Sequence, residues 1–500
     1  MKKIRVRFAP SPTGPLHIGS IRTALYNYLF AKKNNGKFLL RIEDTDQSRL
    51  MFGAENYIIE SLKWCGIKTD EGPTIKGYYG PYSQSERNKI YKKYIKYLLN
   101  NNFAYYAFDK KKKLEKLRND YKKNGDFFLY NYSNRKKLDN SLNLSNEETF
   151  YKINKGIPYV IRYKIPKYSN IEILDLIRGK IYINYKSLDD KILFKSDETP
   201  TYHLANVIDD HLMNISHVIK GEEWLPSMPI NLLLYKSFDW DPPYFLHLPL
   251  ILNPIGKGKI SKRNINKYIF PIFPLKWKKT KGYRELGYSY EAFINMLVLL
   301  GWNPGGSKEI FSLKELISIF DLKKINKSSA KFNYKKTNWF NNKYLQLKSS
   351  KDIFFFFKKE LKKRNIIYIK NNLIYLILNI FRKKFSFLHE IVDNTIFFFK
   401  KKIKYDLFCI TKIHTNNSIK HLHQIKNLLL YVKKFDFLNI KKKINKCIFY
   451  KNINKNYILQ LLRLSMVGSL KGLDIFLIIS IIGKKESIKR IIKIFNIFII

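Results

Sequence analysis

His17 and Gly19, near the N-terminus, have the types and spacing of a site that does chemistry at a nucleotide phosphate. They stand where a loop containing proline and glycine gives way to a helical pattern, and a helix start attracts phosphate through its free N–H groups. Gly19 has no side chain, so a flat base or ribose can approach its backbone. His17 can donate a hydrogen bond to a phosphate oxygen whose charge grows during reaction. Alone, the pair fits a surface histidine at a helix cap equally well.

A second loop, residues 257–263, brings Lys259, Lys262 and Arg263 together beside Gly258 and Ser261. Transfer at an α-phosphate needs dispersed positive charge around an in-line transition state and no covalent nucleophile. Closely spaced cations on a flexible loop suit a mobile clamp on polyphosphate. The competing interpretation is one more basic loop in a chain full of lysine.

The elements that must position these residues alternate between strands and helices over residues 1–87. We expect strands over 2–8 and 38–42, and helices over 20–33 and 53–65. This order predicts an α/β protein and half of a doubly wound parallel sheet. Glu43 falls just past the end of a strand, where ligands of open α/β sheets bind.

The second half of the sheet is expected to begin near Pro200. Tyr202 and Asn206 would share one face of a helix there. A strand ending at Lys220 then leads into a polar turn with Glu223 and Trp224. The indole of Trp224 fits a ligand wall as well as it fits a core position.

Composition bounds the class of protein. The chain has 500 residues, enough for several domains, and an extreme net charge of +53. Most of the excess is lysine beside abundant Asn, Ile, Phe and Tyr, whose codons are A/T-rich, so we attribute it to compositional drift plus a polyanionic partner. The three cysteines are too scattered for a disulfide framework or a zinc site. Without a signal segment or membrane span, we expect a cytoplasmic protein with no membrane partner.

Several strings taken together resemble the glutamyl-tRNA synthetase family, bacterial-type class I aminoacyl-tRNA synthetases. The residues His17 to Ser20 are similar to the family's HIGH signature, preceded by FAPSPTG at 8–14 and followed by RIEDTD at 41–46. The loop 257–263 stands where the family has its KMSKS loop. Further similar strings occur at 282–288, 302–305 and 327–333, and the resemblance returns near 464–474 after a degraded stretch.

The resemblance implies a class I catalytic domain with an inserted α/β domain and C-terminal all-α domains. Its parts are 1–87, the first half of the Rossmann-like domain; 88–200, the inserted tRNA acceptor-binding domain; 201–255, the second half; 256–344, the KMSKS loop and a helical stem-contact domain; and 345–500, the anticodon-binding region. In many relatives the inserted domain carries cysteine ligands for zinc. Residues 105–109 lie in that region without a cysteine, so no zinc is predicted.

The activity implied is ATP-dependent conversion of L-glutamate to glutamyl-adenylate, with Mg²⁺ on the pyrophosphate, and transfer to the 3′ adenosine of tRNA(Glu). The residues implied to bind glutamate are Arg7, Ala9, Ser11, Glu43, Tyr202, Asn206 and Lys220. Those implied to bind ATP are Pro12, Thr13, Gly14, His17, Gly19, Glu223, Trp224, Lys259, Ser261 and Lys262. The catalytic set implied is His17, Gly19, Lys259, Lys262 and Arg263, without a protein-bound metal.

Two departures from the family pattern are visible. The family usually has Arg where Lys220 stands, and Lys cannot grip a carboxylate with two parallel hydrogen bonds. Affinity for glutamate is therefore in doubt, whereas rejection of glutamine should survive because an amide would leave a buried ammonium unpaired. Asn264 and Ile265 follow Arg263 where small or acidic turn residues are common, which puts the loop's dynamics in doubt.

Two other functions stay open at this point. A glutaminyl-tRNA synthetase is disfavoured by the cation at 220 and by a helical C-terminal half where β-barrels would be expected. A non-catalytic tRNA-binding relic is kept open by the drifted C-terminal third, although both signature loops are intact. The sequence leaves unresolved whether tRNA(Gln) is charged as well as tRNA(Glu), and we expect a monomer.

Overall fold

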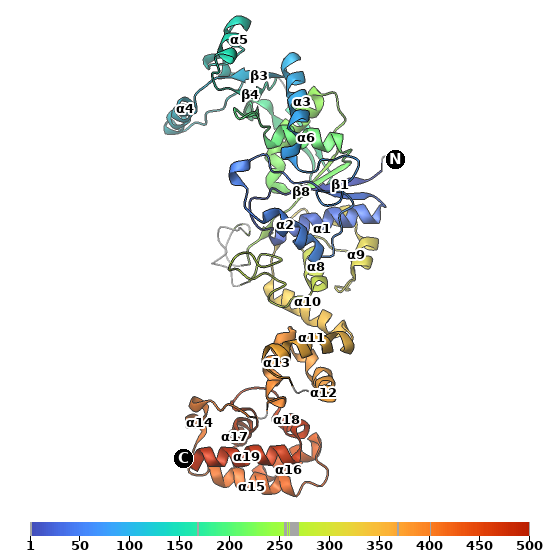
Figure 1. Cartoon of the computed structure of the whole chain (residues 1–500), viewed down its shortest axis with the longest axis vertical. Coiled ribbons are helices and arrows are strands. Elements are labelled where there is room, and N and C mark those ends of the chain that lie inside the picture. Colours follow the sequence, from blue (N-terminus) through green and yellow to red (C-terminus); the bar gives the residue numbers. More distant parts are fainter. Residues whose placement is uncertain are drawn as a thin grey trace. The chain divides into compact units, whose positions relative to one another are not determined.

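The computed structural model describes residues 3–167, 170–254, 258, 260, 270–367, 370–400 and 402–499. The chain divides into two compact units, the first ending at Tyr344 and the second beginning at Leu345 (Figure 1). The first unit contains all the strands described, and it carries the predicted loop that ends at His17.

The first unit is built on parallel strands. β1 (Arg5–Phe8) pairs in parallel with β2 (Lys37–Leu40), and α1 (Ile18–Lys33) connects them. All four residues of β1 are buried, as expected of a parallel strand covered on both faces. The Ser216 N–H donates to the Arg5 carbonyl (2.9 Å), which brings β8 (His217–Gly221) alongside β1. Helices α1 and α6 (Tyr202–Leu212) lie on opposite sides of β1 and β8 (Figure 1).

The sheet continues beyond β8. β8 pairs in parallel with β9 (Tyr244–Leu248), β9 with β5 (Asn170–Asp175), and β5 forms an antiparallel hairpin with β6 (Gly179–Asn184). A hairpin from the 88–200 segment therefore extends the sheet of the second half, which no pattern in the sequence indicates. In the register between β8 and β9, Lys220 lies opposite His247.

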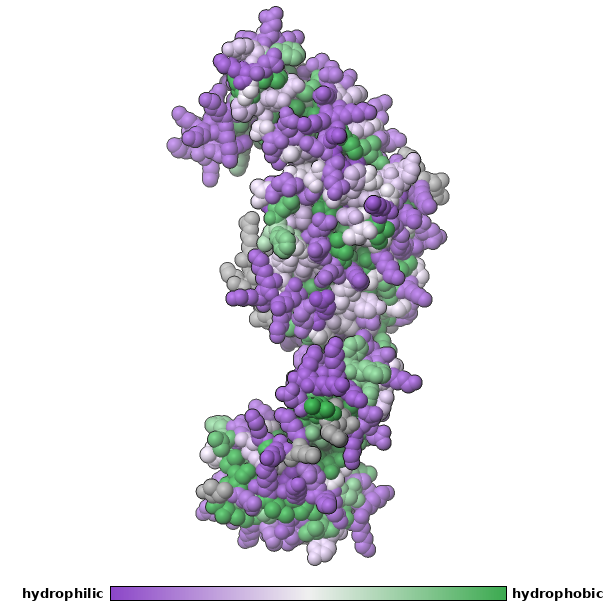
Figure 2. Space-filling model, viewed as in Figure 1, coloured by the Kyte–Doolittle hydropathy of each residue, from purple (hydrophilic) through white to green (hydrophobic). Residues whose placement is uncertain are grey.

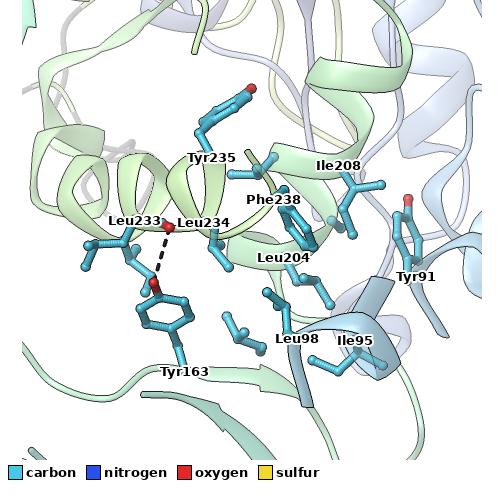
Figure 3. Close-up of a cluster of buried hydrophobic side chains, with 14 of the residues drawn as sticks. Tyr91, Ile95, Leu98, Tyr163, Leu204, Ile208, Leu233, Leu234, Tyr235 and Phe238 are labelled. Carbon is cyan, nitrogen blue, oxygen red and sulfur yellow. Dashed lines mark hydrogen bonds between the residues drawn. The ribbon is translucent and has the colours of Figure 1, made fainter. Parts of the chain in front are cut away.

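The rest of the 88–200 segment forms a second, antiparallel sheet in the order β3-β4-β7 with flanking helices. The elements are α3 (Asn88–Asn100), β3 (Ala104–Ala107), α4 (Lys111–Lys123), α5 (Asn146–Asn154), β4 (Val160–Tyr163) and β7 (Ile192–Phe194). A buried cluster joins this part to α6 and α7 (Met228–Ser237), with Ile95 and Leu98 packed near Leu204 and Leu234 (Figure 3). The Tyr163 hydroxyl donates to the Leu233 carbonyl across this core (3.2 Å).

Helices and a short strand pair complete the first unit. They are α2 (Ala54–Trp64), β10 (Ile251–Leu252), α8 (Tyr290–Val298), α9 (Leu313–Ile319), β11 (Ala330–Lys331) and α10 (Tyr334–Leu347), whose last three residues belong to the second unit. The Tyr26 hydroxyl of α1 donates to the carbonyl of Val298 (2.9 Å), and the Arg22 guanidinium donates to that of Leu300 (2.9 Å). These bonds fix the helical part to the helix that follows the His17 loop.

The second unit is helical in every regular element that the structure describes. The helices are α11 (Ser350–Lys363), α12 (Asn371–Phe381), α13 (Leu388–Thr395), α14 (Leu407–Ile413), α15 (Ser418–Leu430), α16 (Phe437–Tyr450), α17 (Lys455–Val467), α18 (Ile475–Ile482) and α19 (Lys484–Ile499). In α11, Phe354 and Phe357 are buried whereas Phe355 and Phe356 are exposed, because only one helix face meets the core. Hydrophilic side chains cover much of the visible surface of both units (Figure 2). Within the described residues, no helix combines the length and apolarity needed to cross a membrane.

Candidate active site

A cavity of about 1170 Å³ opens in the first unit at the ends of β1 and β8. It is the place where an open α/β sheet binds its ligands. The predicted site residues that line it are Arg7, Ala9, Ser11, Thr13, Gly14, His17, Gly19, Glu43, Tyr202, Lys220, Glu223 and Trp224. Pro12 and Asn206 do not line it, and Lys259, Ser261, Lys262 and Arg263 lie outside the described residues.

His17 is the N-cap of α1. Its Nδ1 accepts from the N–H groups of Gly19 (3.0 Å) and Ser20 (3.4 Å), so a neutral ring carries its proton on Nε2. A Cβ at position 19 would lie only 2.7 Å from His17 Cε1, so glycine is needed for the imidazole to lie across the helix start. The His-x-Gly spacing thus serves one local geometry, in which an imidazole and the first turn of a helix meet at the cavity wall.

Behind this wall lies a buried layer of charge centred on Asp210. Its carboxylate accepts from Arg7 Nε (2.9 Å) and Nη2 (3.2 Å) and from Arg41 Nη1 (2.7 Å). Burial alone would raise the pKa of Asp210, but the two guanidiniums hold it below its ordinary value. A side chain of α6 therefore fixes the guanidinium of Arg7, which lines the cavity.

Glu43 and Asn206 complete this layer. Arg41 Nη2 donates to Glu43 Oε1 (3.2 Å) and to Asn206 Oδ1 (2.9 Å), and Arg7 Nη2 also donates to Asn206 Oδ1 (3.3 Å). Burial raises the pKa of Glu43, although the positive charges of Arg41 and Arg7 oppose that rise. Glu43 faces the cavity and can accept a hydrogen bond from a cationic ligand, whereas the carbonyl of Asn206 is already used by the guanidiniums.

Lys220 differs from every other charged group of this layer. Its Nζ is buried and, among the residues described, has no hydrogen-bond partner, yet the side chain lines the cavity. Burial, reinforced by the charge of Arg7, lowers the pKa of Lys220 to about 7. An unpartnered buried ammonium is costly, and a ligand carboxylate would satisfy it.

Another part of the wall is aromatic and acidic. The rings of Tyr202 and Trp224 lie 4.6 Å apart at a tilt of 32°, and the Trp224 side chain keeps 42% of its surface exposed. Trp224 therefore lines the cavity and is not packed in the core. A Cβ at Gly221 would meet Glu223 Oε2 at 2.2 Å, so this glycine lets the carboxylate of Glu223 lie close to the strand end.

A described residue of the second predicted loop, Ile260, reaches the same cavity. Ile260 lines it, and its N–H donates to the Ile251 carbonyl (3.1 Å). Beyond the residues that are not described, the carbonyl of Ile272 accepts from the Ile18 N–H (2.9 Å), next to His17. Ile260 is thus joined to β10, and Ile272 is joined to the start of α1.

Sequence reasoning missed several residues of the site. Arg41 was recognised only as part of a string, and its role depends on a carboxylate 169 positions away. Lys195 lines the cavity from the 88–200 segment, and its Nζ lies 3.4 Å from the Thr45 carbonyl. Asp209 and Asp210 follow Asn206 at helical spacing, and they are the signal in the sequence that points to a partner for Arg41. No pattern in the sequence points to Lys195.

Comparison with known proteins agrees with this geometry. Residues 3–339 match the family described as "tRNA synthetases class I (E and Q), catalytic domain", and residues 351–495 match an "Anticodon binding domain". Glutamate–tRNA ligases from Flavobacterium johnsoniae and Azobacteroides pseudotrichonymphae are 47% and 48% identical, each over 98% of this chain and 99% of the relative. A crystal structure of a glutamate tRNA ligase from Elizabethkingia meningosepticum, in complex with its amino acid, matches with a TM-score of 0.90 at 45% identity, over 99% of both chains.

Proposed function

Because the chain belongs to the class I tRNA synthetases of the E and Q type, we propose that it is a glutamate–tRNA ligase. The observation that carries glutamate as substrate is the buried ammonium of Lys220, which lacks a protein partner among the described residues and faces the cavity. A side-chain carboxylate would pair with it. The amide of glutamine would leave the charge unpaired.

In the first step, an oxygen of the glutamate α-carboxylate attacks the α-phosphorus of ATP. The new O–P bond forms as the bond to the bridging oxygen breaks, and pyrophosphate leaves with the electron pair. His17 and the start of α1 supply hydrogen bonds and a partial positive charge where negative charge grows. Glu43 can hold the substrate ammonium, and Arg7, fixed by Asp210, adds positive charge beside the carboxylates.

In the second step, a hydroxyl oxygen of the terminal adenosine of tRNA(Glu) attacks the acyl carbon. The bond from that carbon to the phosphate oxygen breaks, AMP leaves with the electron pair, and the hydroxyl proton is released. The rim of the cavity offers polar side chains on the side of the 88–200 segment, among them Lys195 and Thr199. Mg²⁺ would arrive on the phosphates of ATP, as is usual for this ion. Within the described residues, no three His, Cys, Asp or Glu side chains are grouped to hold a metal.

The 88–200 segment is stabilised without zinc in this proposal. The buried carboxylate of Asp190 accepts from the Tyr105 hydroxyl (2.7 Å), from Arg135 Nη1 (3.0 Å) and from the Ile165 N–H (3.1 Å). Such a fully paired buried carboxylate ties distant parts of the segment together.

We further propose that the enzyme acts as a cytoplasmic monomer.

Aminoacylation with labelled glutamate and labelled glutamine, each against purified tRNA(Glu) and tRNA(Gln), tests this function. Glutamate on tRNA(Glu) alone is the result expected of a discriminating enzyme. Glutamate on both tRNAs would keep the ligase and show a relaxed anticodon site. Glutamine charging would favour a glutaminyl enzyme, and tight tRNA binding without charging would favour a relic.

A further inference from the structure

Three buried side chains lie in a row across the sheet beneath the cavity: Asp175 at the end of β5, His247 on β9 and Lys220 on β8. β9 lies between the other two strands. Lys220 and His247 are Cα partners in a parallel register, so their side chains leave the sheet on the same face. Of the three, Lys220 lines the cavity, and His247 is fully buried.

The imidazole of His247 is fixed by the carboxylate of Asp175. Its Nδ1 lies 2.7 Å from Asp175 Oδ2, which also accepts from the His247 backbone N–H (3.0 Å). Asp175 Oδ1 accepts from the N–H groups of Ile177 and Arg178, both at 2.9 Å. The carboxylate is thus locked, and Nδ1 must be the donor to it. In the neutral ring this leaves Nε2 as an acceptor, and among the residues described this buried atom has no hydrogen-bond partner.

Lys220 needs such an acceptor. Its buried surroundings contain Arg7 from β1, Arg41 and Glu43 from the end of β2, Asp210 and His203 from α6, and His247 from β9. Asp210 and Glu43 are already engaged by the guanidiniums. Burial lowers the pKa of His247, which favours the neutral ring beside the cation.

Lys220 Nζ and His247 Nε2 share no hydrogen bond in the structure. We propose that His247 is a positioning residue for Lys220 when glutamate binds: its Nε2 then accepts one ammonium hydrogen and directs the others toward the substrate carboxylate. The assignment rests on the proposed function, since it assumes that Lys220 binds the side chain of glutamate. An arginine would present a rigid planar fork and would need no such guide. A lysine is a point charge on a flexible stem, so its direction has to be set by a second group.

Glutamate-dependent ATP–pyrophosphate exchange, with tRNA(Glu) present, tests the proposal in a double-mutant cycle of His247→Asn and Lys220→Arg. Asn keeps a donor toward Asp175 and removes Nε2. We expect His247→Asn to raise KM for glutamate by about 10- to 100-fold, the effect of one hydrogen bond to a charged group, with kcat and KM for ATP within about twofold. In the Lys220→Arg background the same change should alter KM for glutamate by less than about twofold.

An equal effect of His247→Asn in both backgrounds would overturn the proposal, because it would show a structural role that does not act through Lys220. An unchanged KM for glutamate would overturn it as well, as would a parallel loss of kcat and ATP affinity. If His247→Asn fails to fold, Asp175→Asn replaces it. That change puts a donor opposite Nδ1 and reverses the tautomer, so the same dependence on residue 220 is expected. If the wild-type protein supports ATP–pyrophosphate exchange with none of the amino acids tested, the proposed function itself is contradicted.

Discussion

At the scale of single residues, the site depends on how close Gly19 lies to His17. A methyl group at position 19 would sit 2.7 Å from the imidazole. We predict that Gly19→Ala lowers kcat for adenylate formation by about 10- to 100-fold, because the displaced ring no longer stabilises the transition state. Pyrophosphate exchange with tRNA(Glu) present measures the effect, and KM for glutamate should change little.

His17→Asn separates the two roles of this histidine. Asn is a good N-cap, so the melting temperature should stay near that of the wild type. The variant lacks Nε2, so its kcat should fall as that of Gly19→Ala does. A His17→Asn enzyme with wild-type kcat would show that the histidine acts only as a helix cap.

Lys220 makes glutamate binding depend on pH. Its pKa is lowered to about 7 by burial and by the charge of Arg7, and a lysine is charged only below its pKa. Above that pH the free enzyme loses the ammonium, so KM for glutamate should rise by about tenfold per pH unit. The neighbouring His203 and His247 have lowered pKa values and stay neutral in this range.

The control for this pH dependence is Lys220→Arg, whose guanidinium stays charged. In that variant KM for glutamate should be flat between about pH 7 and 9 and lower than in the wild type at the upper end. If KM for glutamate rose equally with pH in the wild type and in Lys220→Arg, the titrating group would not be Lys220.

At the scale of elements, a single carboxylate on α6 joins β1 to the end of β2. Asp210→Ala would leave the guanidiniums of Arg7 and Arg41 buried without their main partner. We predict a loss of about 3–5 kcal/mol in the free energy of unfolding, measured by chemical denaturation. Removing Lys180, whose ion pair with Glu172 is exposed on the β5–β6 hairpin, should leave the free energy of unfolding almost unchanged. Equal costs would mean that the buried layer does not hold the sheet to α6.

The sequence predicts elements that depend on neighbouring residues better than contacts between distant elements. The strand, loop and helix around His17 are set by neighbours in sequence, so the pattern places them to within a few residues. The family resemblance implied that Arg7 binds the substrate, and the structure places its side chain in the cavity lining. Its fixed geometry depends on Arg41 and Asp210, however, and such pairing between distant elements leaves no local pattern. The extension of the sheet by β5 and β6 escaped for the same reason, because the pairing partner β9 lies some 70 residues further on.

At the scale of the whole molecule, the net charge of +53 predicts a strong salt dependence of tRNA binding. If several lysines contact phosphates, KM for tRNA(Glu) should rise by about three orders of magnitude between about 50 and 200 mM salt. KM for glutamate should change little, because the cavity charges are buried and poorly screened. The slope of log KM for tRNA(Glu) against log salt concentration gives the number of counterions released. A slope that corresponds to fewer than about three counterions would assign the excess charge to compositional drift.

The most direct test of the account is the ratio of kcat/KM for glutamate to that for glutamine, measured by pyrophosphate exchange with tRNA(Glu) present, in the wild type and in Lys220→Met. Methionine has a similar length and no charge, so the buried position stays filled. We predict that the wild type favours glutamate by about 10³-fold or more, since glutamine leaves the buried ammonium unpaired, and that Lys220→Met loses most of this preference. An unchanged ratio in Lys220→Met would contradict the claim that Lys220 selects the substrate.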